Sequence, residues 1–265
     1  MSKLRILWGH KGVRFITLGW TGFITENLVM SHNREYIIDY LNEYNYHLIY
    51  NTLSTAAMIS VIYGYIRYRN YNNITMNNIF NSWNINSRSF KITSLSMQSL
   101  GLIGISQIFP KIQNPFVFNM DISSDNTNKT SIESDIKPKS KYKYISTQCP
   151  IDFSYSKNLP NNGIHGLKRI TRHPTLFSFG FLSFGIVFKT INPATVSLCI
   201  FPLIMAFIGG YHQDYRYKRN IGGTLPIEIE NVTSLVPFYA LLTGKQEWNE
   251  LNNEIKYTNI ILACS

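Results

Sequence analysis

Residues 190–213 read "TINPATVSLCIFPLIMAFIGGYHQ", a run of 24 residues without a formally charged side chain. Two further runs have the same character: residues 48–66, "LIYNTLSTAAMISVIYGYI", and residues 92–110, "ITSLSMQSLGLIGISQIFP". About 20 predominantly apolar residues in a helix are enough to cross the hydrocarbon core of a bilayer. These runs therefore predict helices that span a membrane.

Two weaker segments complete the prediction. Residues 15–30 are apolar but interrupted by Glu26, and residues 174–188 are short but can extend into their neighbours. Together the segments predict an all-α, polytopic integral membrane helix bundle of about five transmembrane helices. The alternative is a large soluble helical core, because Ser, Thr and Asn within the runs soften their hydropathy.

The charge content agrees with a membrane protein. Charged residues make up 15% of the chain, against about 25% in soluble domains. The net charge of +10 comes from Lys and Arg in short groups between uncharged runs, which does not form one continuous basic face. We therefore expect membrane lipids and other membrane-protein subunits as partners, and no nucleic acid.

Four regions follow from the changes in composition. Residues 1–110 comprise a basic leader and the first three membrane helices, and residues 111–163 form a polar insertion rich in Ser, Thr, Asn and charges of both signs. Residues 164–245 contain an apolar hairpin and a C-terminal block. Residues 246–265 are a polar tail.

The positive residues predict the topology, with one conflict. Basic residues precede the first crossing and follow the second, whereas Asp39 and Glu43 lie between the two crossings. Residues 168–172 and 216–219 are also basic and should share a side with the earlier groups, yet the run at 92–110 separates them. We expect five crossings, with the long insertion exempt from the rule that basic loops lie on one side of the membrane. The alternative is that residues 92–110 re-enter the membrane without crossing it.

The cysteines and the basic leader give weaker evidence on the kind of site and the location of the protein. Cys149, Cys199 and Cys264 are far apart, which supports neither a disulfide framework nor a zinc site. The first 25 residues hold four basic residues and no acidic one, which favours a mitochondrial address, with a plastid address as the alternative. The same charges also serve as a topology signal.

Residues 169–174, "RITRHP", stand at the entrance to the 174–188 segment. A helix start leaves N–H groups unpaired, and Pro174 in its first turn removes one while presetting the backbone angle. Arg172 and His173 are then predicted at the membrane interface. There they can anchor the helix, or meet lipid phosphate, a loop carboxylate or a polar ligand.

The order of motifs resembles the NnrU family of membrane proteins, which includes zeta-carotene isomerase. The chain has "GIHGLKRITRHP", then "YHQDYRYKRNIGG" and then "TSLVPFYALLTGKQEW". Upstream, "YHLIYNTLS" at 46–54 and "SWN" at 82–84 are similar to two other family segments. The positions that match the family are Arg172, His173, Pro174, Thr233, Ser234, Pro237, Phe238 and Gly244. Asp214 and Arg216 approximate the family's Asp-Arg pattern, and His212 stands in the same motif as a structural residue.

The resemblance implies a multi-helix membrane bundle and, in the isomerase branch, a haem held between two helix histidines. At the first of these positions, where the family has His-Ser, this chain has Glu26 and Asn27, and at the second it has Ile186. We therefore expect that the haem has been lost. The histidines His10, His32, His47 and His165 are expected at interfaces or in loops rather than on a metal.

The function expected from these observations is that of a structural or accessory subunit in an organelle membrane assembly, most simply the mitochondrial inner membrane. The main alternative is an isomerase acting on a membrane-dissolved polyene; a membrane methyltransferase, which also carries "RHP", is a weaker one. The candidate polar or ligand site comprises Arg169, Arg172, His173, Asp214 and Arg216, with no metal. We also expect Arg172 to lie close to Asp214, because the helices between them form an antiparallel hairpin.

Overall fold

The computed structural model describes residues 3–71, 75–80, 82–108, 116–118, 145–147, 164–255 and 257–264. The chain forms two units, one of residues 1–108 with 154–265 and one of residues 109–153. Within the second unit the described residues form an antiparallel pair, β1 (Phe116–Phe118) and β2 (Ile145–Thr147), with Val117 opposite Ser146. The rest of the polar insertion expected at 111–163, including Cys149, lies outside the described residues.

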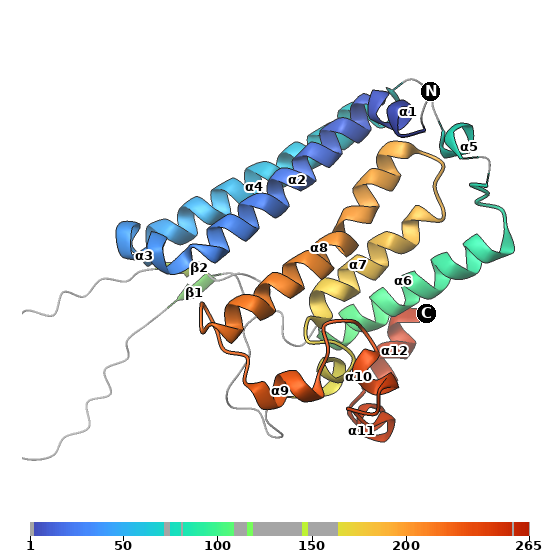
Figure 1. Ribbon diagram of the computed structural model, residues 1–265. Helices are drawn as coiled ribbons and strands as arrows, with labels where there is room; N and C mark the ends of the chain where they lie inside the picture. Colours follow the sequence, from blue (N-terminus) through green and yellow to red (C-terminus); the bar gives the residue numbers. More distant parts are fainter. Residues whose placement is uncertain are drawn as a thin grey trace, which may run out of the picture. The chain divides into compact units, whose positions relative to one another are not determined.

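The larger unit is all-α in its described part, which confirms the predicted fold class at that level (Figure 1). Its longest helices are α2 (Lys11–His32), α4 (Glu43–Tyr68), α6 (Arg88–Ile108), α7 (Pro174–Val187) and α8 (Pro193–Lys218). The shorter helices are α1 (Lys3–Gly9), α3 (Arg34–Leu41), α5 (Met76–Ile79), the 3-10 helix η4 (Gly166–Arg169), α9 (Ile227–Val232), α10 (Tyr239–Leu242), α11 (Trp248–Glu254) and α12 (Tyr257–Cys264).

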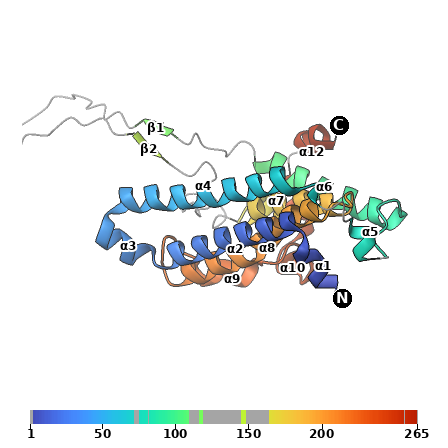
Figure 2. The ribbon, with the colours of Figure 1, turned by 90° about the horizontal axis from the view of Figure 1, so that it is seen from above.

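Helices α2 and α4 form an antiparallel hairpin that packs on α8 (Figure 2). The core of this contact is apolar, with Ile16, Trp20, Val61 and Ala194 buried together. The indole of Trp20 stacks on Phe201 with 5.9 Å between ring centroids. Burying apolar surface on one stripe of each helix is what holds the three together.

Helices α6 and α7 approach each other closely because small residues line their contact. A Cβ on Gly101 would lie 2.5 Å from the backbone N of Leu182, and a Cβ on Gly185 would lie 2.9 Å from the carbonyl O of Ser94. The hydroxyl of Ser94 donates to the carbonyl of Gly185 at 2.7 Å. Packing through glycine and serine is typical of helices that associate in membranes.

Membrane-spanning capacity is clearest for one helix. In the described part of the chain, α8 alone is long and apolar enough to cross a membrane, with a mean hydropathy of 1.9 over its most apolar 18 residues. Only 22% of that window is buried inside the protein. The other predicted spans fall in α2, α4, α6 and α7, and α7 has 14 residues, about 21 Å of helix.

The long helices alternate in direction, and contacts define the two ends of this unit. At one end the side-chain amide of Asn192, before α8, donates to the carbonyl of Arg69, after α4, at 2.7 Å. Trp83, before α6, donates to the carbonyl of Thr190 at 3.0 Å. At the opposite end Arg216 of α8 donates to the carbonyl of Ser31 in α2 at 3.1 Å. We call the end with Asn192 and Trp83 the α2-start end. We call the opposite end, with Arg216, the α8-finish end.

Candidate functional site

The central contact of the candidate site joins the segment just before α7 to the last turns of α8. Arg172 donates from Nε and Nη2 to Oδ2 of Asp214, at 2.9 and 2.7 Å. The predicted approach of these two residues is therefore confirmed. Both side chains are largely buried, with 14% and 8% of their surface exposed, so the pair is shielded from solvent.

His173 completes the pairing of Asp214. Its Nε2 lies 2.8 Å from Oδ1 of Asp214, so both oxygens of the carboxylate are occupied. The imidazole packs on Gly210, where a Cβ would come within 2.9 Å of the histidine Cδ2. A side chain at position 210 would push the ring off the aspartate, so the missing Cβ is what allows this approach.

A loop from the C-terminal block lies along the residues that precede α7. The Nη1 of Arg172 donates to the carbonyl of Thr233 at 3.0 Å, and its backbone N–H donates to the carbonyl of Ser234 at 2.9 Å. The hydroxyl of Thr171 donates to the carbonyl of Leu235 at 2.7 Å. The three segments that carry the resemblance, around 172, 214 and 233, thus meet in one polar cluster, which we call the Arg172 cluster.

Arg169 does not belong to the Arg172 cluster. It is buried against the C-terminal tail, where it donates to both oxygens of Glu254 at 2.8 and 2.7 Å and to Oε1 of Gln246 at 2.6 Å. It also forms an ion pair with Glu250. The hydrogen bond from Arg169 lowers the pKa of Glu254 to about 2, and the same bond raises the pKa of Arg169.

Arg216 and His212 form a third group, with α2 as the partner. Arg216 lies near the end of α8 and donates to the carbonyl of Ser31, while His212 Nε2 lies 3.1 Å from the Ser31 hydroxyl. The rings of His212 and His32 have centroids 5.8 Å apart. The five residues predicted as one site are therefore divided among three separate contacts.

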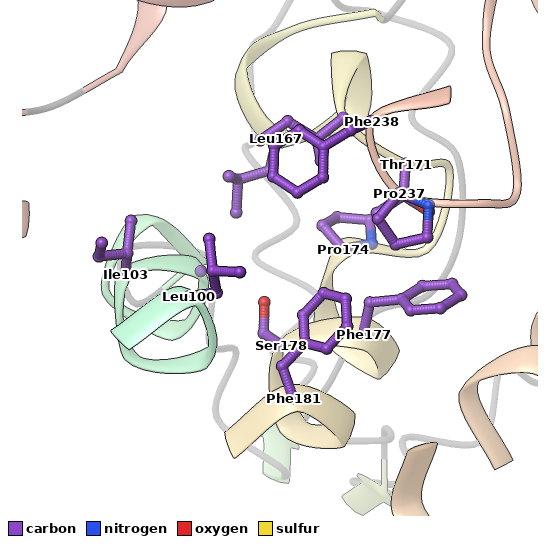
Figure 3. Close-up of a pocket in the computed structure, with 12 residues that line it drawn as sticks. Leu100, Ile103, Leu167, Thr171, Pro174, Phe177, Ser178, Phe181, Pro237 and Phe238 are labelled. Carbon is purple, nitrogen blue, oxygen red and sulfur yellow. The ribbon is translucent and has the colours of Figure 1, made fainter. Parts of the chain in front are cut away.

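An apolar cavity lies beside the Arg172 cluster, between α6 and α7 (Figure 3). Pro174, Phe177 and Phe181 of α7 line it opposite Leu100 and Ile103 of α6. The cavity has a volume of about 60 Å³. Pro237 and Phe238 close one side, as Figure 3 shows, and Phe238 has a φ of 65°, which is rare for an aromatic residue.

The two positions that would hold a haem do not fit it. Asn27 accepts from the hydroxyl of Tyr50 at 2.5 Å, and Glu26 accepts from the hydroxyl of Ser54 at 2.9 Å, so both are engaged by α4. Ile186 has no donor atom, and 38% of its surface is exposed. Axial ligation of haem iron needs nitrogen, sulfur or oxygen donors. These two positions therefore do not support haem chemistry.

The other side chains that could bind a metal are also separated from one another. No group of three His, Cys, Asp or Glu side chains able to hold a metal occurs among the described residues. His47 lies 3.8 Å from Glu43, His165 lies 3.2 Å from Glu254, and His10 caps the start of α2 by accepting from the N–H of Val13. Gly244 has a φ of 71° in the turn after α10.

No model of a protein family matches this chain, and no match was found among characterised proteins or among solved structures.

Sequence reasoning missed the partners of Arg169. Glu250 and Glu254 stand four residues apart on α11, so they share one helix face, which is a signal of a basic partner. Nothing in the sequence indicates which basic residue that partner is. The role of Thr171, which accepts from the N–H of His173 at 3.3 Å, was likewise not predicted.

Proposed function

We propose that this chain is an integral membrane protein of the NnrU type, with five spanning helices, that serves as a structural or accessory subunit of a membrane assembly. One observation carries the accessory role. In the Arg172 cluster both carboxylate oxygens of Asp214 are paired within the protein, and the guanidinium of Arg172 binds Asp214 and the Thr233 carbonyl. Groups paired in this way stabilise a junction and are not presented to a substrate.

The cavity beside the cluster supports the same reading. At about 60 Å³ it is far smaller than the roughly 300 Å³ or more of a typical ligand site. Its lining is aromatic and aliphatic, and its polar side chains are the hydroxyls of Thr171 and Ser178. An isomerase acting on a long polyene needs a larger space.

The membrane location is supported by the outer surface of the long helices. Large apolar side chains are exposed on several of them, including Leu18 of α2, Ile59 of α4 and Leu95 of α6, with 61%, 61% and 64% of their surface accessible. A soluble helical protein buries one stripe of each helix and keeps the other polar. Lipid contact explains why both faces are apolar here. The proposed location is the mitochondrial inner membrane, with a plastid membrane as the alternative.

The test is to isolate the tagged chain from its native membranes in a mild detergent and to measure the mass of the intact particle. We expect resistance to extraction with alkaline carbonate and a particle larger than the monomer that contains other membrane subunits. Cell fractionation identifies the organelle. A chain recovered only as a free monomer contradicts the accessory role, and release by carbonate contradicts membrane integration.

A further inference from the structure

An open pocket lies at the α2-start end of the larger unit, where α4 finishes. It is lined by Lys11 together with residues 66–71 and has a volume of about 390 Å³. Three of its lining side chains are cationic: Lys11, Arg67 and Arg69. We call it the basic pocket.

The three cations are held against aromatic rings. Lys11 Nζ lies 4.9 Å from the ring centroid of Tyr71, and the guanidinium carbons of Arg67 and Arg69 lie 5.6 and 5.9 Å from the centroids of Tyr68 and Tyr65. A cation within about 6 Å of a ring centroid is attracted by the ring, which is not a hydrogen-bonded anion, so its N–H donors stay available for an acceptor. The tyrosines therefore position the charges without neutralising them.

No carboxylate in the described part of the chain pairs with these three cations. The acidic residues of that part lie elsewhere: Glu26 is within α2, and the others are in α3, at the start of α4, near the end of α8, or in and after α9. At the α8-finish end, by contrast, basic side chains have acidic partners, as in the pair of Lys218 with Glu230. Three cations around one pocket that have no carboxylate partner among the described residues favour an anionic ligand.

The neighbouring surface indicates what is attached to that anion. Ile66 lines the basic pocket and Ile62 lies one turn before it on α4, with 67% and 50% of their surface exposed. Tyr63 beside them is 54% exposed. A ligand with an anionic head and an apolar tail would match both the pocket and this stripe.

We propose that the basic pocket binds the phosphate headgroup of an anionic phospholipid, with an acyl chain along Ile62 and Ile66. The proposal rests on the membrane location proposed above, because it needs the pocket at the level of the lipid headgroups. Basic pockets between membrane helices are suited to such headgroups. Each basic side chain near an anionic membrane surface contributes about 1 kcal/mol, so three contribute about a hundredfold in affinity.

The experiment uses the full chain in a neutral detergent, titrated with phosphatidylglycerol or with phosphatidylcholine, with bound lipid counted by native mass spectrometry. We expect clear preference for phosphatidylglycerol. The triple variant Lys11→Gln, Arg67→Gln, Arg69→Gln should bind it about a hundredfold more weakly. The matched control is Arg88→Gln, Lys91→Gln, Lys189→Gln, which removes three charges from the same end outside the pocket and should lose less than about threefold.

Equal losses in the two triple variants would mean diffuse attraction, and no lipid preference would mean no site; either result overturns the proposal. Inorganic phosphate at millimolar concentration should not displace the lipid. Displacement would identify a free-anion site instead. If the triple variant does not keep its helical circular dichroism, the single variant Lys11→Gln, expected to bind about fivefold more weakly, provides the test. Lipid preference in detergent is read independently of carbonate extraction, so the two proposals can fail separately.

Discussion

Asp214 is the residue on which the junction between α7, α8 and the C-terminal block depends. One of its oxygens accepts twice from Arg172 and the other pairs with His173. Arg172 in turn binds the carbonyls of Thr233 and Ser234 through its side chain and backbone. Removing the carboxylate charge would leave a buried guanidinium without its anion.

The first prediction concerns Asp214→Asn. Breaking a buried ion pair from one side costs about 3 kcal/mol, because the remaining charge stays buried without compensation. We expect a clearly lower thermal unfolding temperature in detergent. The control is Asp39→Asn, the same chemical change at an exposed site in α3, which should change stability by less than about 0.5 kcal/mol. Equal shifts in the two variants would contradict the structural role of Asp214.

The second prediction concerns the pH dependence of the pair between Arg169 and Glu254. The pKa of Glu254 is about 2 in the folded chain, below its ordinary value of 4.5, because Arg169 donates to its carboxylate. The pair therefore stabilises the tail fully above about pH 4.5 and loses this contribution as the pH falls toward 2. Hydrogen exchange of α11, corrected for intrinsic rates, should be faster at about pH 3 than at about pH 6.

Glu254→Gln provides the control for that measurement. The variant should show the faster exchange of α11 already at about pH 6, with little further change on acidification. Loss of pH dependence in the variant assigns the effect to this carboxylate. An unchanged pH dependence would assign it to another group.

At the scale of the elements, the contact of α6 with α7 depends on the absence of side chains. The third prediction is that Gly101→Val separates these helices, since even a Cβ there would lie 2.5 Å from the backbone N of Leu182. The control is Gly22→Val in α2, where nothing lies within 4 Å of the added Cβ. The thermal unfolding temperature in detergent should be clearly lower in the first variant than in the second. Equal unfolding temperatures in the two variants would contradict the prediction.

The helices were largely predictable because their apolar runs and prolines are local signals. Pro174 and Pro193 stand at the first turns of α7 and α8, where proline is favoured. The contact of Arg172 with Asp214 was also predictable, since a short antiparallel hairpin brings the residues at its two ends together. The pairing of Arg169 with Glu254 was not, because 85 residues separate the two and only the tertiary packing of the tail selects the partner.

At the scale of the larger unit, the two ends differ in how their charges are compensated. The α2-start end carries basic residues and none of the acidic residues of the described part, whereas the α8-finish end carries both signs in ion pairs such as Arg172 with Asp214. This offers an answer to the topology conflict in the sequence. The basic residues at 168–172 and 216–219 lie at one end, opposite the uncompensated group, and acidic partners offset much of their charge.

The fourth prediction is the orientation that follows from this difference. In a background with Cys149, Cys199 and Cys264 replaced, a cysteine at Asn70 should be labelled by an impermeant reagent only from the side that retains positive loops. A cysteine at Glu228, in α9, should be labelled only from the other side. Labelling of both positions from one side would contradict five crossings.

The tie between Arg169 and Glu254 also sets an order of events during synthesis. Arg169 leaves the ribosome 85 residues ahead of its carboxylate partner, and Arg172 leaves 42 residues ahead of Asp214. At about 5–20 residues per second, Arg169 waits roughly 4–17 s for that partner. Arg172 can pair with Asp214 about halfway through this interval, so the contact of α7 with α8 can form before Arg169 meets Glu254. Helix α11 is therefore expected to dock on an end that α7 and α8 have already formed.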